Sequence, residues 1–399
     1  MANTNKMTAQ ELRSCLSLSL VFLLRMFGLF LILPVFVLYA EKLPDATPTL
    51  TGIALGSYGL TQAFLQIPFG ILSDRIGRKK IIVSGLIIFI IGSLIAASTH
   101  SIYLIILGRA LQGAGAIAAA IMALASDLTR DDQRSKAMAM IGISIGFSFM
   151  LAFVVGPMLN PHVGVPGLFV ISGIMALLAI LVLVFMVPNP PASALHKNTQ
   201  PMRHDLAMVL ANIGLTRFFA GVFILHMTLT ASFVALPLVL RDKAHVIAAH
   251  HWHVYLPVMF IAGVLMMPFL IASEKYKKTN LFLSCGVILM VISQAGFYYW
   301  HNNIWEISVV LVLFFLAFNY LEASLPAMIS RAAPPERKGA AMGVFSTSQF
   351  VGTFVGGLSG GILHERLGLN SVFLFCIGIG LIWFLVDISL QKFIQHSSL

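Results

Sequence analysis

The stretch Gly70–Lys80 reads G-I-L-S-D-R-I-G-R-K-K and lies between two long apolar runs. These runs, Leu50–Ser73 and Ile81–Ser98, are each long enough to cross a bilayer as a helix. A short connection that carries many Lys and Arg residues stays on the cytoplasmic side of a membrane. The stretch therefore indicates two membrane-spanning helices that are joined by a basic cytoplasmic turn.

The composition extends this interpretation to the whole chain. Of the 399 residues, 58% are hydrophobic and only 10% are charged, with a mean hydropathy of +0.93. A soluble protein of this length could not cover its surface with so few polar residues. The net charge of +10 requires no acidic partner, because the basic residues lie in short loops between apolar spans. We expect an integral membrane protein that binds the lipid bilayer and no nucleic acid.

The apolar runs predict an all-α membrane protein with twelve transmembrane helices. Most of the 25 Lys and Arg residues fall in loops on one side of this arrangement, which places both termini in the cytoplasm. The predicted spans are residues 14–40, 50–73, 81–98, 102–126, 137–160, 167–187, 215–240, 251–272, 281–299, 304–329, 340–363 and 370–391.

The longest polar break divides the chain into two halves. It predicts a cytoplasmic linker over residues 188–214, between a six-helix bundle at 1–187 and another at 215–399. A weak repeat relates Arg134–Gly142 to Arg337–Phe345, and paired six-helix halves are one transporter architecture. Because only Lys392–Leu399 follows the last span, we expect no soluble domain after it.

The basic turn contains a candidate charge cluster. Asp74 lies at a helix end, Arg78 follows four residues later, and Asp127 at the end of the fourth span is a candidate partner for Arg78. Such a pair can bias a conformational equilibrium; the alternative is a solvated loop that only sets topology. The candidate conformational latch comprises Gly70, Asp74, Arg75, Gly77, Arg78, Lys79 and Asp127.

Three motifs resemble the major facilitator superfamily of transporters, and in particular its drug:proton antiporter group. The pattern G-x-L-x-D-R-x-G-R-K-K resembles the loop between helices 2 and 3 of that family, and R-A-L-Q-G-A-G-A (Arg109–Ala116) resembles its span-4 motif. A-F-V-V-G-P-M-L-N (Ala152–Asn160) matches the antiporter motif only partly, at Gly156 and Pro157. The resemblance implies two pseudo-symmetric bundles, a latch that holds the outward-facing state, and a proton-coupling role for Arg109.

Ionisable residues inside spans are candidates for proton coupling. Arg25, Arg109, His226 and Glu322 lie on spans 1, 4, 7 and 10, which line the cavity in the architecture that the resemblance implies. Histidine changes its charge near neutral pH without special tuning. We therefore expect Glu322 or His226 to carry the proton, although these groups could merely satisfy one another.

Aromatic, methionine and amide residues on the same spans suit a largely apolar ligand. Packing within the bundles is the alternative for most of them. The candidate substrate-binding residues are Met26, Phe27, Phe30, Tyr58, Gln62, Gln66, Phe147, Met150, Phe233, Phe318, Asn319 and Gln349.

Motifs of other functional classes are missing from the sequence. It contains no G-x-x-x-x-G-K-[ST] and no H-E-x-x-H. We expect no enzyme, no cofactor and no metal, with an ion gradient as the energy source. Cys15, Cys285 and Cys376 are expected to be free thiols, and the histidines near 245–253 are expected to be solvated rather than metal-binding.

The sequence thus predicts a monomeric secondary transporter in a bacterial inner membrane. It would move a small organic molecule by alternating access, with proton-driven export as the favoured mechanism. Two alternatives stay open: a proton-coupled importer of a nutrient or siderophore, and a non-transporting receptor on the same scaffold.

Overall fold

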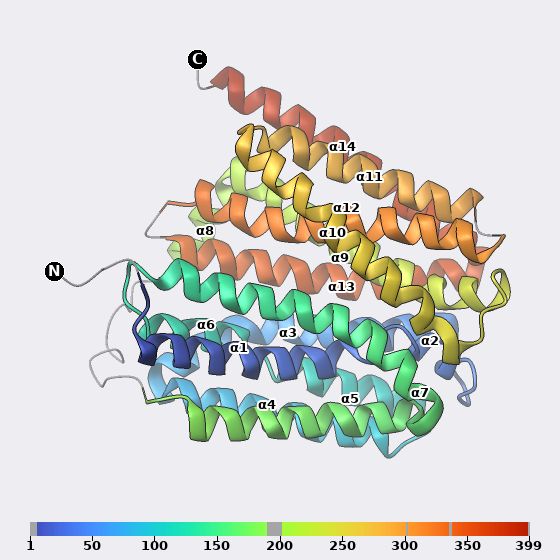
Figure 1. Cartoon of the computed structure of the whole chain (residues 1–399), viewed down its shortest axis with the longest axis horizontal. Coiled ribbons are helices and arrows are strands. Elements are labelled where there is room, and N and C mark those ends of the chain that lie inside the picture. Colours follow the sequence, from blue (N-terminus) through green and yellow to red (C-terminus); the bar gives the residue numbers. More distant parts are fainter. Residues whose placement is uncertain (1–5, 190–201, 301, 335–336, 398–399) are drawn as a thin grey trace. The chain divides into compact units, whose positions relative to one another are not determined.

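The computed structural model describes residues 6–189, 202–300, 302–334 and 337–397, and these residues are almost entirely helical (Figure 1). The predicted all-α fold is confirmed within these ranges, where no strand occurs. By their contacts the residues divide into two compact units. Most of the predicted linker, residues 190–201, lies outside the described residues, and the predicted domain boundaries stay a prediction.

The first unit comprises Met1–Phe36 and Phe64–Gln200. Within it, α7 packs against α1 and α4, and α4 also packs against α5 and α6. Its helices are α1 (Ala9–Phe30), the second part of α3 (Pro48–Ile76), α4 (Arg78–Ala97), α5 (Ile102–Ala114), α6 (Ala118–Asp127) and α7 (Arg134–Met186).

The second unit comprises Val37–Ala63 and Pro201–Leu399. Within it, α9 packs against α12, α13 and α14, and α11 packs against α12 and α14. Its elements are α2 (Phe36–Ala40), the first part of α3, α8 (Met202–Ala211), α9 (Ile213–Asp242), the 3₁₀ turn η2 (Ala248–His250), α10 (His251–Lys275), α11 (Thr279–Tyr299), α12 (Ile304–Ala332), α13 (Lys338–Leu367) and α14 (Asn370–Ser397).

The helices account for all twelve predicted crossings. Nine helical segments of the described residues are long and apolar enough to span a membrane. One of them, α7, holds two predicted spans, because Gly164 has a φ of 67° and breaks the helix between Pro161 and Pro166. The remaining two crossings are α3 and α13, which have 29 and 30 residues.

Two predicted spans are interrupted rather than continuous. The first is divided into α1 and α2 by a turn that contains Pro34, which has no N–H for a helical hydrogen bond. The fourth is divided into α5 and α6 near Gly115, where a side chain would overlap the carbonyl oxygen of Gly85 on α4. Close backbone approach at glycine is therefore a packing feature of this unit.

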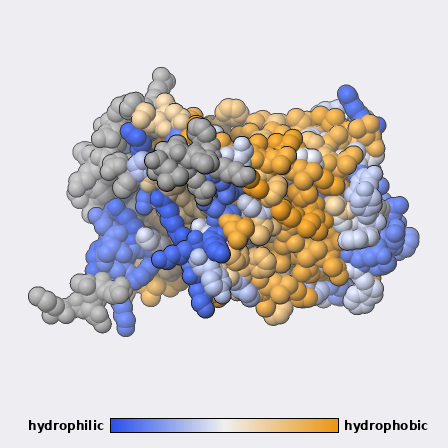
Figure 2. Space-filling model, turned by 90° about the horizontal axis from the view of Figure 1, so that it is seen from above, coloured by the Kyte–Doolittle hydropathy of each residue, from blue (hydrophilic) through white to orange (hydrophobic). Residues whose placement is uncertain are grey.

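The surface agrees with a membrane environment. Figure 2 shows a hydrophobic band between hydrophilic residues at both ends of the face in view. Leu374, Leu381 and Leu385 of α14 are between 47% and 64% exposed. A soluble protein would not leave such a stripe of leucines in water, whereas lipid tails accept it.

Candidate functional site

Three polar side chains from three helices meet inside the second unit. The Nε2 atom of His226 on α9 lies 2.9 Å from Oε2 of Glu322 on α12. The amide nitrogen of Gln349 on α13 lies 2.9 Å from the same His226 Nε2 and 3.1 Å from Oε1 of Glu322. We call these three residues the polar triad. It joins both residues that the sequence marks as proton carriers to one of the candidate substrate-binding amides.

Local sequence positions the triad. Phe318 lies four residues before Glu322, and hence on the same face of α12; its ring contacts the His226 ring edge-on at 5.6 Å between centroids. The side chain of His226 is 10% exposed, whereas that of Glu322 is 31% exposed. The Glu322 carboxylate is therefore partly accessible although it lies near the middle of a span. Partial access lowers the free-energy cost of placing a charged group at this depth.

The geometry at His226 makes hydrogen bonding depend on a proton. With a proton on Nε2, the imidazole donates to Glu322. Without that proton, Nε2 accepts from the Gln349 amide, which can also donate to Glu322 through its second N–H. One nitrogen cannot do both at once. The hydrogen bonds of the triad therefore depend on whether His226 carries a proton on Nε2.

The two arginines among the proton-coupling candidates are buried in the first unit, on α1 and α5. Arg109 is 2% exposed and donates to Oε1 of Gln112 at 2.7 Å, and the Gln112 amide donates to Ser93 on α4 at 2.8 Å. Arg25 is 1% exposed, donates to the carbonyl of Gly115 at 3.4 Å, and lies over the Phe89 ring. Both thus take part in a buried network between α1, α4 and α5.

The charge cluster after α3 is also assembled. Arg78 contacts Asp74 and donates to Oδ2 of Asp127 at 3.0 Å and to the Ser73 hydroxyl at 2.9 Å. The side chains of Arg78 and Asp127 are 14% and 18% exposed. The sequence-predicted pair is therefore present, while its role as a latch stays a prediction.

The other members of the candidate latch have separate surroundings. Gly77 has a φ of 113° and makes the turn between α3 and α4. Gly70 faces Ala119 on α6, Arg75 is exposed, and Lys79 donates to the carbonyl of Val187. Only Arg78, Asp74 and Asp127 among the candidate latch residues form one ion-pair cluster.

Gly156 of the antiporter-like motif also has a structural constraint. A side chain there would overlap the carbonyl oxygen of Leu31, at the end of α1. Pro157 follows it within α7 and is buried. The two residues therefore allow α1 and α7 to approach closely.

The candidate substrate-binding residues differ in accessibility. Phe233 is fully buried against Tyr255 and Phe315, as expected for packing. Phe147 is 48% exposed. Of the others, Met26, Phe27, Tyr58, Gln62, Gln66 and Phe318 are buried, and Phe30, Met150, Asn319 and Gln349 are half-buried.

A buried ion pair was not predicted. Arg217 on α9 lies 3.6 Å from Asp387 on α14, and both side chains are less than 10% exposed. Arg217 also donates to Asn280 on α11 at 3.0 Å. Each residue was visible as an ionisable group at the edge of a span, but nothing in the sequence joins them.

The second unit also contains close contacts between α3 and α13. A side chain at Gly52 would overlap the carbonyl oxygen of Gly357, and one at Gly357 would overlap that of Gly52. In the same unit, Arg241 of α9 pairs with Glu41, which follows α2. Near the start of α3, the Thr49 amide donates to Glu365 of α13 at 2.9 Å. We call the contacts of Gly52, Gly357, Thr49 and Glu365 the α3–α13 contact. It ties a segment from the first half of the sequence to the second half.

Comparisons with known proteins agree with this fold. The family model described as Major Facilitator Superfamily matches residues 18–246 and 218–391. The chain is 45% identical to the inner membrane transport protein YajR of Escherichia coli (strain K12), over 98% of this chain and 86% of that protein. It is 23% identical to the quinolone resistance protein NorA of Staphylococcus aureus (strain MSSA476), over 89% and 90%.

A solved structure shows the same fold at low sequence identity. It is a bacterial homologue of the human lysosomal transporter Spinster, in an inward-facing and occupied conformation. The TM-score is 0.81 at 13% identity, with 97% of this chain and 98% of that chain covered.

Proposed function

Because this chain belongs to the major facilitator superfamily of transporters, we propose that it exports a small, largely apolar organic molecule in exchange for protons. The proposed location is a bacterial inner membrane, with both termini in the cytoplasm and the protein acting as a monomer. The polar triad is the observation that carries this proposal, since it brings a partly accessible carboxylate and a histidine within hydrogen-bond distance of each other.

Proton binding at the triad would couple to transport through its hydrogen bonds. His226, Glu322 and Gln349 come from α9, α12 and α13, so a proton that changes their bonds changes the interaction between three helices. A protonation event can shift a two-state equilibrium only if it stabilises one state more than the other. The triad meets this condition if the helices move relative to one another during transport.

The ion-pair cluster and the α3–α13 contact are both formed in this structure, and each would favour the states that keep it. Arg78 and Asp127 form a partly buried ion pair. Removing this pair by mutation would shift the conformational equilibrium away from the states that contain it. The α3–α13 contact joins residues 48–63 to the second half of the sequence. In an alternating-access cycle this contact would have to break for α3 to move with the first half.

Support for export comes from the relative NorA, whose name describes quinolone resistance, and from the partial antiporter motif at Gly156 and Pro157. Aromatic and methionine side chains on the cavity-lining spans favour an apolar substrate. The proposed substrate class is thus a small organic compound with a large apolar surface, such as a quinolone.

The test uses inside-out membrane vesicles from cells that produce the protein. A fluorescent quinolone, or a compound that raises the unfolding temperature of the purified protein, is added outside while respiration acidifies the interior. Export predicts accumulation inside the vesicles that a protonophore abolishes. Accumulation only in right-side-out vesicles would indicate import, and no transport or exchange in either orientation would indicate a receptor.

A further inference from the structure

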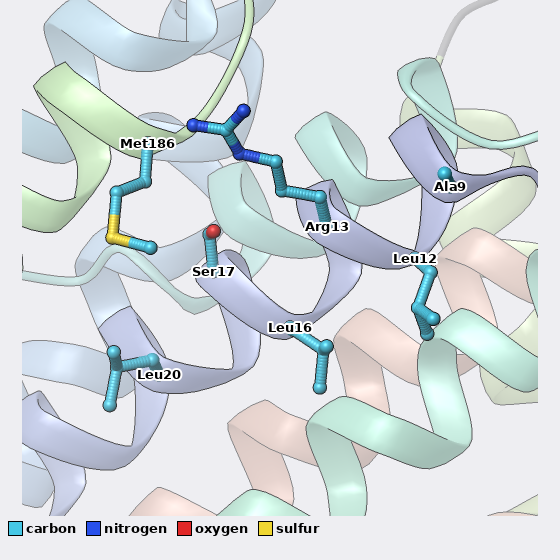
Figure 3. Close-up of a pocket in the computed structure, with 7 residues that line it drawn as sticks. All are labelled: Ala9, Leu12, Arg13, Leu16, Ser17, Leu20 and Met186. Atoms are coloured by element: carbon cyan, nitrogen blue, oxygen red, sulfur yellow. The ribbon is translucent and has the colours of Figure 1, made fainter.

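A groove on the first unit combines an apolar floor with a cationic rim. It has a volume of about 350 Å³ and lies along α1 beside the end of α7 (Figure 3). Leu12, Leu16 and Leu20 are 43%, 55% and 38% exposed, and Met186 is 42% exposed. Since the leucines are four residues apart, they form one stripe along the helix.

Arg13 gives this groove its charge. Figure 3 shows its side chain extending past Ser17 toward the side of Met186. Arg13 is exposed and forms no ion pair or hydrogen bond with any residue that the structure describes. The nearest carboxylate in sequence, Glu11, is already bonded to Thr8 and Arg130. The guanidinium is therefore available to an external anion.

A second cation lies at the same end of the groove. Lys79 of α4 donates to the carbonyl of Val187, the residue that follows Met186. Arg13 lies at the start of the first predicted span, and Leu16 and Leu20 follow at about one and two helical turns, each about 5.4 Å long. In a bilayer, Arg13 would lie at the level of the phosphates and the leucines at that of the acyl chains.

We propose that this groove binds an anionic phospholipid from the cytoplasmic leaflet. Arg13 would donate to the lipid phosphate, and one acyl chain would lie along Leu16 and Leu20. An anionic lipid fits better than a zwitterionic one. Among the described residues the groove offers Arg13 to a phosphate, but it has no carboxylate that could bind the positively charged amine of a zwitterionic headgroup. The chain's own segment 190–201 fits poorly, since it contains Lys197 and no acidic residue.

The test measures which lipids the purified protein retains. The protein in detergent is given equal amounts of phosphatidylglycerol and phosphatidylcholine with identical acyl chains, and retained lipids are counted by native mass spectrometry. One cation near a membrane surface contributes about 1 kcal/mol to binding of an anionic lipid, or about fivefold. We expect wild type to retain about fivefold more phosphatidylglycerol, Arg13→Gln to lose this preference, and Arg13→Lys to keep it.

Lys80→Gln is the matched control, because Lys80 is an exposed cation on the same side that does not line the groove. Leu16→Ala should lower retention of both lipids. Equal retention of the two lipids by wild type would overturn the proposal, as would an unchanged preference in Arg13→Gln or an equal loss in Lys80→Gln. A dimer of the protein that Leu16→Ala dissociates would also overturn the proposal, because the groove would then bind a second copy of the protein rather than a lipid.

Discussion

At Nε2 of His226, two neighbours depend on opposite protonation states of one nitrogen. Glu322 can accept from Nε2 only when it carries a proton, and Gln349 can donate to it only when it does not. A change of protonation at Nε2 therefore exchanges one interhelical hydrogen bond for another. In the mechanism that we propose, this exchange would link pH to helix position at the residue scale.

Replacing Gln349 with leucine should move the pH dependence of transport. The amide donates to the Glu322 carboxylate and to unprotonated His226, so it stabilises the proton-free triad. A hydrogen bond to a charged group contributes about 1.5–3 kcal/mol, so its loss should change how transport depends on pH. We expect the pH of half-maximal transport to rise in Gln349→Leu. An unchanged profile would show that the amide does not influence the proton.

Replacing Asp127 with asparagine should slow transport without preventing folding. The substitution removes the charge of a partly buried partner of Arg78, which contributes on the order of 1 kcal/mol. We expect about a fivefold lower transport rate, measured beside the yield of monodisperse protein. Asp131→Asn is the control, since Asp131 is 87% exposed and pairs with Arg134. Equal rates in the two variants would remove the latch role.

Sequence analysis predicted the members of these sites better than their contacts. The Arg78–Asp127 pair could be predicted because a known motif places Arg78 in the turn and Asp127 ends a span on the same side. The triad could not, because a contact between α9, α12 and α13 depends on how each helix is rotated. The Arg217–Asp387 pair was missed for the same reason.

At the element scale, breaks in helices and close glycine contacts determine the packing. The spans were predicted from hydropathy, and the break at Gly164 lies between two of them, but the breaks at Pro34 and Gly115 inside spans were not predicted. Nor does the sequence reveal that residues 37–63 pack with the second half of the chain. A transporter that works by alternating access adopts more than one conformation, and this packing belongs to one of them.

Replacing Gly357 with alanine should open the α3–α13 contact. The new methyl group would overlap the carbonyl oxygen of Gly52, and this backbone atom has little room to move. In a Cys285→Ser background with Thr49→Cys, we expect labelling by a membrane-impermeant maleimide to become several-fold faster. Gly343→Ala is the control on the same helix, because its added methyl group meets open space. Equal labelling of the two variants would contradict a gating role for this contact.

At the scale of the whole molecule, twelve crossings and a family match establish a membrane transporter. Hydrophobicity alone predicted the membrane-spanning helices, since long apolar runs have few alternatives in a bilayer, while the two-bundle fold was predicted from the repeat and the family motifs. The substrate and the direction of transport depend on a few side chains and on energy coupling, neither of which follows from hydropathy. Coupling of the triad to the proton gradient is therefore the central claim.

The most direct test compares two modes of transport in proteoliposomes that contain Glu322→Gln. Uptake driven by a pH gradient requires a proton to bind and leave, whereas counterflow exchange of the same labelled substrate does not. The account predicts that Glu322→Gln abolishes gradient-driven uptake but keeps exchange. Glu306→Gln, which changes a half-buried carboxylate in the first turn of the same helix, should keep both. Gradient-driven uptake at the wild-type rate in Glu322→Gln would contradict the account.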